Sequence, residues 1–196
     1  MTPEQALLKL TEGNERFVKG TNHYRIDPDA RASLLQGQSP FATILGCSDA
    51  RVPVEHIFDQ GFDALFIVRV AGNVVGPNEL ASLLYAALHV RTPLVVVLGH
   101  TMCGAITAAL APIEERKKEP AVIQRLLQQI DPALQDIDPL VPMPERVALA
   151  AKVNVKRMVN QLKAEPVLTQ LLQAGHLMVV GAIYDLHSGK VNFISS

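Results

Sequence analysis

The sequence predicts an α/β fold: a single domain with a mainly parallel central sheet flanked by helices, an N-terminal helical arm and a C-terminal antiparallel edge strand. Strand-like segments alternate with amphipathic helical segments, which is the order of parallel sheets with right-handed crossovers. The strand-like segments are almost continuously apolar, as in strands that are covered on both faces. The chain has 196 residues, 48% of them hydrophobic, which is enough for one full core.

The first 40 residues predict the helical arm. Residues 3–19 are amphipathic, and Pro3 suits a first helical turn. A turn-rich stretch from Gly20 to Pro40 follows. Strands are then expected at 41–46, 64–71 and 94–99. Before the third strand, apolar residues at i, i+3, i+4, i+7 and i+8 predict a helix, namely Leu80, Leu83, Leu84, Ala87 and Leu88.

The second half of the chain is less regular. Residues 111–144 hold many prolines and the charged run 114–119, so they predict a solvated Pro-rich connection with a short helix around 122–129. Residues 177–185 predict a fourth strand, and 191–194 its hairpin partner. A long helix is expected from Pro144 to about Ala164, with a buried side formed by Val147, Ala151, Val155, Met158 and Leu162.

Composition excludes several classes of function. Because no apolar stretch approaches the roughly 18 residues that span a bilayer, we expect a soluble protein. The N-terminus lacks a basic segment followed by an apolar one, so no signal peptide is predicted and a cytoplasmic location is expected. A net charge of −1 gives no electrostatic reason to bind nucleic acid or an anionic membrane.

The two cysteines, Cys47 and Cys103, are the most informative residues. A lone cysteine is usually a buried structural residue, and two can form a disulfide, although nothing in the sequence indicates an oxidising compartment. His100 and Cys103 lie three residues apart, on one side of a single turn. Because Cys47 and His100 follow predicted parallel strands, both should lie at the carboxyl edge of the sheet. Two thiolates and one imidazole fill three positions of a tetrahedral Zn²⁺ and leave the fourth open.

Several neighbours fit this interpretation. Asp49 and Arg51 place an acid and a base two residues apart after the first cysteine. Glycines at 46, 99 and 104 would let the backbone turn closely around a metal, and a helix that begins near residue 104 would direct its N-terminus at the site.

The Cys-Ser-Asp-Ala-Arg motif at 47–51 and the Gly-His-Thr-Met-Cys-Gly motif at 99–104 resemble those of the β-class carbonic anhydrases. The resemblance is strongest over about 37–110 and extends loosely over the whole chain, 1–196. It implies reversible hydration of CO₂ to bicarbonate and a proton by zinc-bound hydroxide, with one Zn²⁺ per chain. The implied residues are the metal ligands Cys47, His100 and Cys103 and the catalytic pair Asp49 and Arg51.

The same resemblance implies a substrate-binding surface. Gln38, Phe66 and Tyr85 match residues that bind substrate in the family, partly across a dimer interface, so a homodimer or a dimer of dimers is expected. Tyr85 also falls outside the apolar stripe of its predicted helix, which leaves it free to face a partner or a cleft. Arg69 and Asn73 match positions near the site, and we expect structural or interface roles for them.

Some family members close the metal with the aspartate of the first motif, as a fourth ligand, when bicarbonate occupies a nearby pocket that uses a tryptophan. The matching position here is Ile44, and the chain has no tryptophan. Because Ile44 offers no N–H donor to an anion, we expect Asp49 to stay paired with Arg51.

Two alternatives remain open. One is hydrolysis of COS or CS₂ on the same zinc site, because relatives on this scaffold accept linear sulfur analogues of CO₂. The other is a noncatalytic, zinc-stabilised scaffold. The scaffold is disfavoured because structural zinc sites normally have four protein ligands, and the sequence offers three.

Overall fold

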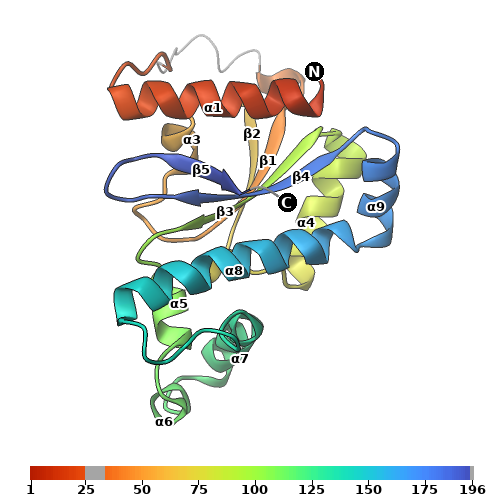
Figure 1. Cartoon of the computed structure of the whole chain (residues 1–196). Coiled ribbons are helices and arrows are strands. Elements are labelled where there is room, and N and C mark those ends of the chain that lie inside the picture. The colour runs from red at the N-terminus through yellow and green to blue at the C-terminus, as the bar shows by residue number, and fades with distance from the viewer. Residues whose placement is uncertain (25–33, 195–196) are drawn as a thin grey trace.

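Five strands form one sheet in the order β2-β1-β3-β4-β5 (Figure 1). The computed structural model describes residues 1–24 and 34–194. The first four strands are parallel, and β5 pairs with β4 in the antiparallel direction. Their bounds are β1 Ala42–Gly46, β2 Leu65–Arg69, β3 Leu94–His100, β4 Met178–Tyr184 and β5 Val191–Ile194. The predicted sheet and its antiparallel C-terminal strand are therefore confirmed.

Helices cover both faces of the sheet. Figure 1 shows α1 and α3 on one face and α4 and α8 on the other, with α5, α6 and α7 below the left-hand part of α8 in this view. Their bounds are α1 Pro3–Lys19, α3 Val54–Ile57, α4 Pro77–Tyr85, α5 Gly104–Ala109, α6 Ile113–Arg116, α7 Ala121–Ile130, α8 Met143–Lys163 and α9 Pro166–Gln173. Short 3₁₀ turns occupy 34–36, 71–73 and 131–133.

The alternation of side chains along β3 divides the core between the two faces. Val95 and Val97 belong to the cluster that contains the buried side of α8, whereas Leu94, Val96 and Leu98 pack with α1 and α3. Successive side chains of a strand point to opposite faces. Both faces of β3 are therefore buried, which is why its sequence is uniformly apolar.

The N-terminal helix begins and ends where its sequence predicts. Thr2 and Gln5 form a reciprocal capping box, Pro3 occupies the first turn, and Gly20 ends the helix with a φ of 66°. The buried Asn14 then fastens α1 to the rest of the fold. Its Nδ2 donates to the carbonyl oxygens of Ile57 and Gly189. The turn-rich stretch predicted at 20–40 lies partly outside the described residues.

The long helix α8 packs unusually close to the sheet. A Cβ atom built on Gly99 of β3 would lie 2.6 Å from Val155 Cγ2, and one built on Gly181 of β4 would lie 2.6 Å from Val155 Cγ1. Both strands therefore need glycine at the point where Val155 crosses them, because a normal contact between carbon atoms is about 3.5–4.0 Å. The five apolar residues predicted for the buried side of this helix are all buried.

Other elements differ from the sequence prediction. The helix predicted through Leu88 widens into a π-helix at Ala86–Val90, and Leu88 is 44% exposed. A π-turn adds a residue per turn and so shifts the side chains that follow it off the buried stripe. The helices α3 and α9 are additional to the predicted ones.

The charged run at 114–119 is only partly a solvated connection. Its first residues form α6, and the side chain of Arg116 is 14% exposed. Arg116 Nη2 lies 2.7 Å from Asp131 Oδ1, and Nη1 donates to the Ala109 carbonyl oxygen. Burial of this one cation is possible because both partners come from neighbouring elements, which the pattern of charges does not reveal. Among the described residues, no helix is both long enough and apolar enough to cross a membrane.

Candidate metal centre

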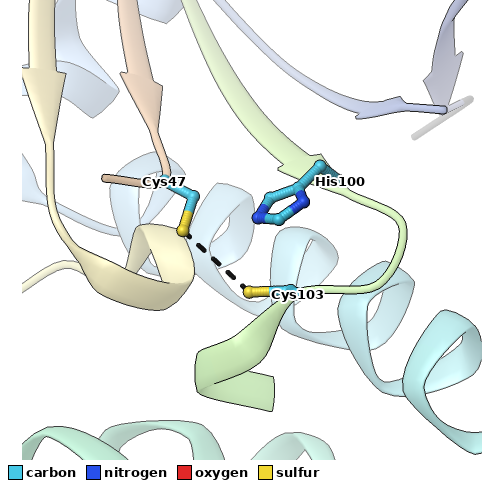
Figure 2. A group of neighbouring side chains, drawn as sticks. All are labelled: Cys47, His100 and Cys103. Carbon is cyan, nitrogen blue, oxygen red and sulfur yellow. Dashed lines mark hydrogen bonds between the residues drawn. The ribbon is translucent and has the colours of Figure 1, made fainter. Parts of the chain in front are cut away.

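Cys47, His100 and Cys103 converge at the carboxyl edge of the sheet (Figure 2). Cys47 directly follows β1, His100 is the last residue of β3, and Cys103 directly precedes α5. In the register of β1 and β3, Gly46 lies opposite Leu98, so Cys47 follows at the level of Gly99, one residue before His100. Parallel pairing thus brings together two segments that are about fifty residues apart in the sequence, as predicted.

The three side chains form a compact set of donor atoms. One ligand atom from each lies within 4.8 Å of the others, and all three residues are buried. The two Sγ atoms are 4.0 Å apart. A tetrahedral Zn²⁺ with Zn–S bonds of about 2.3 Å would place its two sulfur ligands about 3.8 Å apart. The separation of the sulfur atoms therefore fits a metal of this size.

The ring of His100 is oriented for ligation. Its Nδ1 lies 2.9 Å from the carbonyl oxygen of Thr101, which can only accept a hydrogen bond, so Nδ1 carries the proton. The buried Nε2 atom has no hydrogen-bond partner among the described residues. A buried imidazole nitrogen without a partner is costly unless a metal or proton occupies it, and fixing the tautomer through the other nitrogen is typical of metal ligands.

One of the two thiols, that of Cys47, favours the ionised form that a metal requires. The pKa of Cys47 is lowered chiefly because the Cys103 thiol donates to its sulfur, and backbone N–H groups, including that of Gly72, add to this effect against that of burial. The pKa of Cys103 is raised because its proton is held by Cys47, by burial, and by repulsion from the Cys47 thiolate. Of the two sulfur atoms, that of Cys47 is therefore the one that ionises first.

Asp49 and Arg51 form a hydrogen-bonded pair beside this cluster. Arg51 donates to Asp49 from its backbone N and Nε, both at 2.9 Å, and from Nη2 at 2.7 Å. These bonds, with the charge of Arg51, hold the pKa of Asp49 well below its usual range. Asp49 Oδ2 lies 3.9 Å from His100 Nε2, so the carboxylate borders the metal cluster while it remains paired with Arg51. Arg51 Nη2 also donates to the carbonyl oxygen of Met102.

Arg69, at the end of β2, holds the loop that carries this pair. Its Nε donates to the carbonyl oxygen of Cys47 at 2.9 Å, and its Nη2 donates to that of Asp49 at 2.6 Å. The structural role expected for Arg69 is therefore to fix the backbone between the first cysteine and the aspartate.

The residues expected to bind substrate lie elsewhere in this chain. Phe66 pairs with Thr43, four residues before Cys47, which is about 13 Å along the strand. The rings of Phe66 and Tyr85 are 6.4 Å apart, and Tyr85 is 51% exposed. Gln38 is exposed, between the 3₁₀ turn at 34–36 and β1. The structure thus brings together Phe66 and Tyr85 but separates them from the metal cluster of the same chain.

Sequence reasoning misses one contact at the cluster and misassigns the glycines around it. The backbone N–H of Gly72 donates to Cys47 Sγ at 3.3 Å, and the only signal for it in the sequence is a glycine directly after the predicted strand 64–71. The φ angles at 46, 99 and 104 are not in the left-handed region. Gly99 instead makes room for α8, and a Cβ on Gly104 would meet open space. The helix predicted to begin at residue 104 is present as α5.

The fold and the cluster define an α/β protein with three buried side-chain donors that could hold a metal ion. Comparison with known proteins identifies the family within this class. Residues 42–191 match the family model described as carbonic anhydrase. Carbonic anhydrase 2 of Mycobacterium tuberculosis is 38% identical over 192 residues, covering 96% of this chain and 91% of the relative. Carbonic anhydrase of Mycolicibacterium smegmatis is 35% identical, covering 98% of this chain and 94% of the relative.

Solved structures agree with this assignment. The β-carbonic anhydrase CafA of Aspergillus fumigatus is 28% identical, with a TM-score of 0.75 over 98% of this chain and 90% of that chain. A tetrameric β-carbonic anhydrase from Sordaria macrospora shares the fold at 24% identity, with a TM-score of 0.80 over 98% of both chains. The chain belongs to the β-class carbonic anhydrases, as its two motifs predicted.

Proposed function

We propose that the protein catalyses the reversible hydration of CO₂ to bicarbonate and a proton, with one Zn²⁺ per chain held by Cys47, His100 and Cys103. The observation that carries the proposal is the convergence of three buried soft donors, one of them an imidazole nitrogen without a partner among the described residues. Thiolate and imidazole are the ligands that Zn²⁺ prefers, and three protein ligands are typical of catalytic sites. A bound Zn²⁺ would supply a Lewis acid and an acidified water molecule.

The Asp49–Arg51 pair would orient the reacting groups. Because Arg51 keeps Asp49 ionised, the carboxylate can only accept hydrogen bonds. A ligand at the fourth position of the metal would therefore have to donate a hydrogen bond to Asp49. The lone pair of that donor is then directed away from Asp49, toward an incoming CO₂. Because two thiolates cancel the formal charge of Zn²⁺, a bound ion would acidify water less than it would with three neutral ligands, and orientation by Asp49 would gain importance.

We also propose that the active form is a homodimer or a dimer of dimers. Phe66 of the edge strand β2 and Tyr85 of α4 form an apolar pair, and the register places Phe66 about 13 Å along the sheet from Cys47 of the same chain. The edge strand β2 is only partly buried. A second copy that covers this edge would bring the Phe66–Tyr85 pair of one chain toward the metal of the other, with Gln38 as a hydrogen-bonding group for bicarbonate.

Metal analysis together with stopped-flow CO₂ hydration tests the proposal. The purified protein should contain about one zinc per chain and hydrate CO₂. Replacement of Cys47, His100 or Cys103 by alanine should remove both properties. Asp49→Asn should keep the metal but lower the rate of hydration by about 10²-fold or more, because the amide also donates hydrogen bonds.

The control is His176→Ala, which removes an exposed histidine just before β4, at the opposite edge of the sheet. This variant should retain both zinc and activity. Full activity in the metal-free protein would overturn the proposal. Faster turnover of COS or CS₂ than of CO₂ would establish the sulfur substrates instead, and zinc binding without any turnover would establish the scaffold.

A further inference from the structure

A row of α8 side chains holds the loop that follows β2. Asn154 Nδ2 donates to the carbonyl oxygen of Gly72 at 2.8 Å. The sulfur of Met158 accepts a hydrogen bond from the N–H of Val75 at 3.2 Å, and Gln161 Nε2 donates to the carbonyl oxygen of Val75 at 3.1 Å. Because residues at i, i+4 and i+7 share one face of a helix, α8 serves as a template for the backbone between 72 and 75.

Gly72, in this loop, contacts the metal cluster. The N–H of Gly72 donates to Cys47 Sγ at 3.3 Å. Gly72 has a φ of 73°, and a Cβ atom there would lie 2.9 Å from Ile130 Cδ1. One residue therefore links two groups: its carbonyl oxygen is held by Asn154, and its N–H points at the Cys47 sulfur.

The burial of Asn154 indicates a role beyond packing. The residue is 1% exposed, and its neighbours on the buried side of α8 are mainly apolar. A buried amide is costly unless it makes hydrogen bonds, so an apolar residue would serve packing alone better. The orientation of the amide is fixed because a carbonyl oxygen can only accept, so the nitrogen of Asn154 must face Gly72.

We propose that Asn154 is a positioning residue for the Cys47 thiolate. By holding the Gly72 carbonyl, it fixes the turn in the conformation that directs the Gly72 N–H at Cys47 Sγ. That N–H stabilises the sulfur lone pairs, which keeps Cys47 available as a ligand and limits the charge it transfers to a metal. The inference deepens the proposed function and rests on Cys47 being a metal ligand.

The test compares Asn154→Leu with Gln161→Leu. Both substitutions remove an amide of α8 that donates to a carbonyl oxygen of the same loop, but only the first affects Gly72. Each protein is loaded with Co²⁺, whose thiolate-to-metal absorption reports the energy of the sulfur lone pairs. We expect Asn154→Leu to shift this absorption to longer wavelength and to weaken metal binding about 10–100-fold in chelator competition. Gln161→Leu should match the wild-type protein in both measurements.

The wild-type protein separates this inference from the proposed function. If Co²⁺-loaded wild-type protein lacks thiolate-to-metal absorption, the metal site itself is wrong. If the absorption is present and unchanged in Asn154→Leu, or equally changed in Gln161→Leu, the positioning role is wrong. Asn154→Ser, which shortens the side chain but keeps it polar, provides a second variant with the same expected shift if Asn154→Leu does not fold.

If neither variant folds, the wild-type protein loaded with ¹¹³Cd decides the outcome. Coupling between the Gly72 amide proton and ¹¹³Cd through Cys47 Sγ would support the inference, because it requires the N–H···S hydrogen bond. Lack of that coupling, with the metal bound, would overturn it.

Discussion

Gly99→Ala should disturb both the stability of the fold and the metal centre, because Gly99 packs against α8 and directly precedes His100 in the chain. An added Cβ would lie 2.6 Å from Val155 Cγ2 and 3.0 Å from Ile183 Cδ1. Both distances are well below the roughly 3.5–4.0 Å of a normal carbon contact, so either α8 or the end of β3 must move. Any movement of β3 at this point also displaces His100, the next residue.

The loss of stability on Gly99→Ala should be large because the side chain of Val155 has little freedom to move away from the new Cβ atom. Valine on a helix has one strongly preferred rotamer, and the other methyl of Val155 already faces Gly181. We therefore expect Gly99→Ala to lower the free energy of unfolding by about 2–3 kcal/mol, near the upper end of the range for overpacked cores. Val155→Ala should itself cost about 2 kcal/mol through lost burial and a cavity. In the double variant the new methyl group at position 99 occupies the space that Val155→Ala leaves. The double variant should therefore lose about 1–2 kcal/mol less stability than the two single variants lose together.

Urea unfolding of the zinc-loaded proteins, at one fixed metal concentration, measures these differences. Gly46→Ala is the matched control, because Gly46 also lies in a strand and directly precedes a proposed ligand. A Cβ there would lie 3.4 Å from Val54 Cγ2, an ordinary contact, so the loss should stay below about 1 kcal/mol. The reasoning is refuted if Gly99→Ala unfolds at the wild-type urea concentration, or if the losses of the two single variants simply add.

Three further predictions concern acid stability, assembly and regulation. Burial alone would raise the pKa of Asp59, but the Arg16 side chain and two backbone N–H groups donate to the carboxylate and lower its pKa from 3.8 to about 2. Asp59 therefore stabilises the fold above about pH 4 and loses this effect as the pH falls toward 2. Asp59→Asn should cost about 2 kcal/mol at neutral pH, and urea unfolding should show the gap closing in acid; a constant gap would contradict this. Sedimentation at assay concentration should find activity only in dimers or larger assemblies, and an active monomer would exclude the shared site. Because the side chain of the buried Ile44 has no N–H group to donate to an anion, bicarbonate should inhibit without cooperativity, and a sigmoidal inhibition curve would contradict that expectation.

The sequence predicts those parts of the fold whose signal is periodic. The four parallel strands and the buried side of α8 follow directly from runs and spacings of apolar residues. The exposure of Leu88 does not, because it depends on a π-turn that changes the period within one helix. Burial of Arg116 also escapes prediction, because its partner Asp131 lies on another element. Periodicity predicts which face a residue occupies, but not an irregular turn or a distant polar partner.

The metal centre shows the same division. Cys47, His100 and Cys103 are recognisable because their residue types are rare and their spacing is short. The contact from Gly72 to Cys47 spans 25 residues, and that from Asn154 to Gly72 spans 82. Glycine and asparagine are common residues with many roles, so neither contact can be distinguished before the backbone of the loop is known.

The register of the sheet explains why the metal cluster forms within one chain whereas Phe66 lies away from it. Cys47 lies level with Gly99, so one residue and one turn bring His100 and Cys103 beside it. Phe66 pairs with Thr43, which fixes it about 13 Å from the same edge, and no rotation of a side chain spans that distance. Zinc binding should therefore depend on the fold of a single chain, whereas CO₂ hydration should also depend on the pairing of chains. Substitution of the exposed residue Tyr85 should accordingly lower activity without removing the metal.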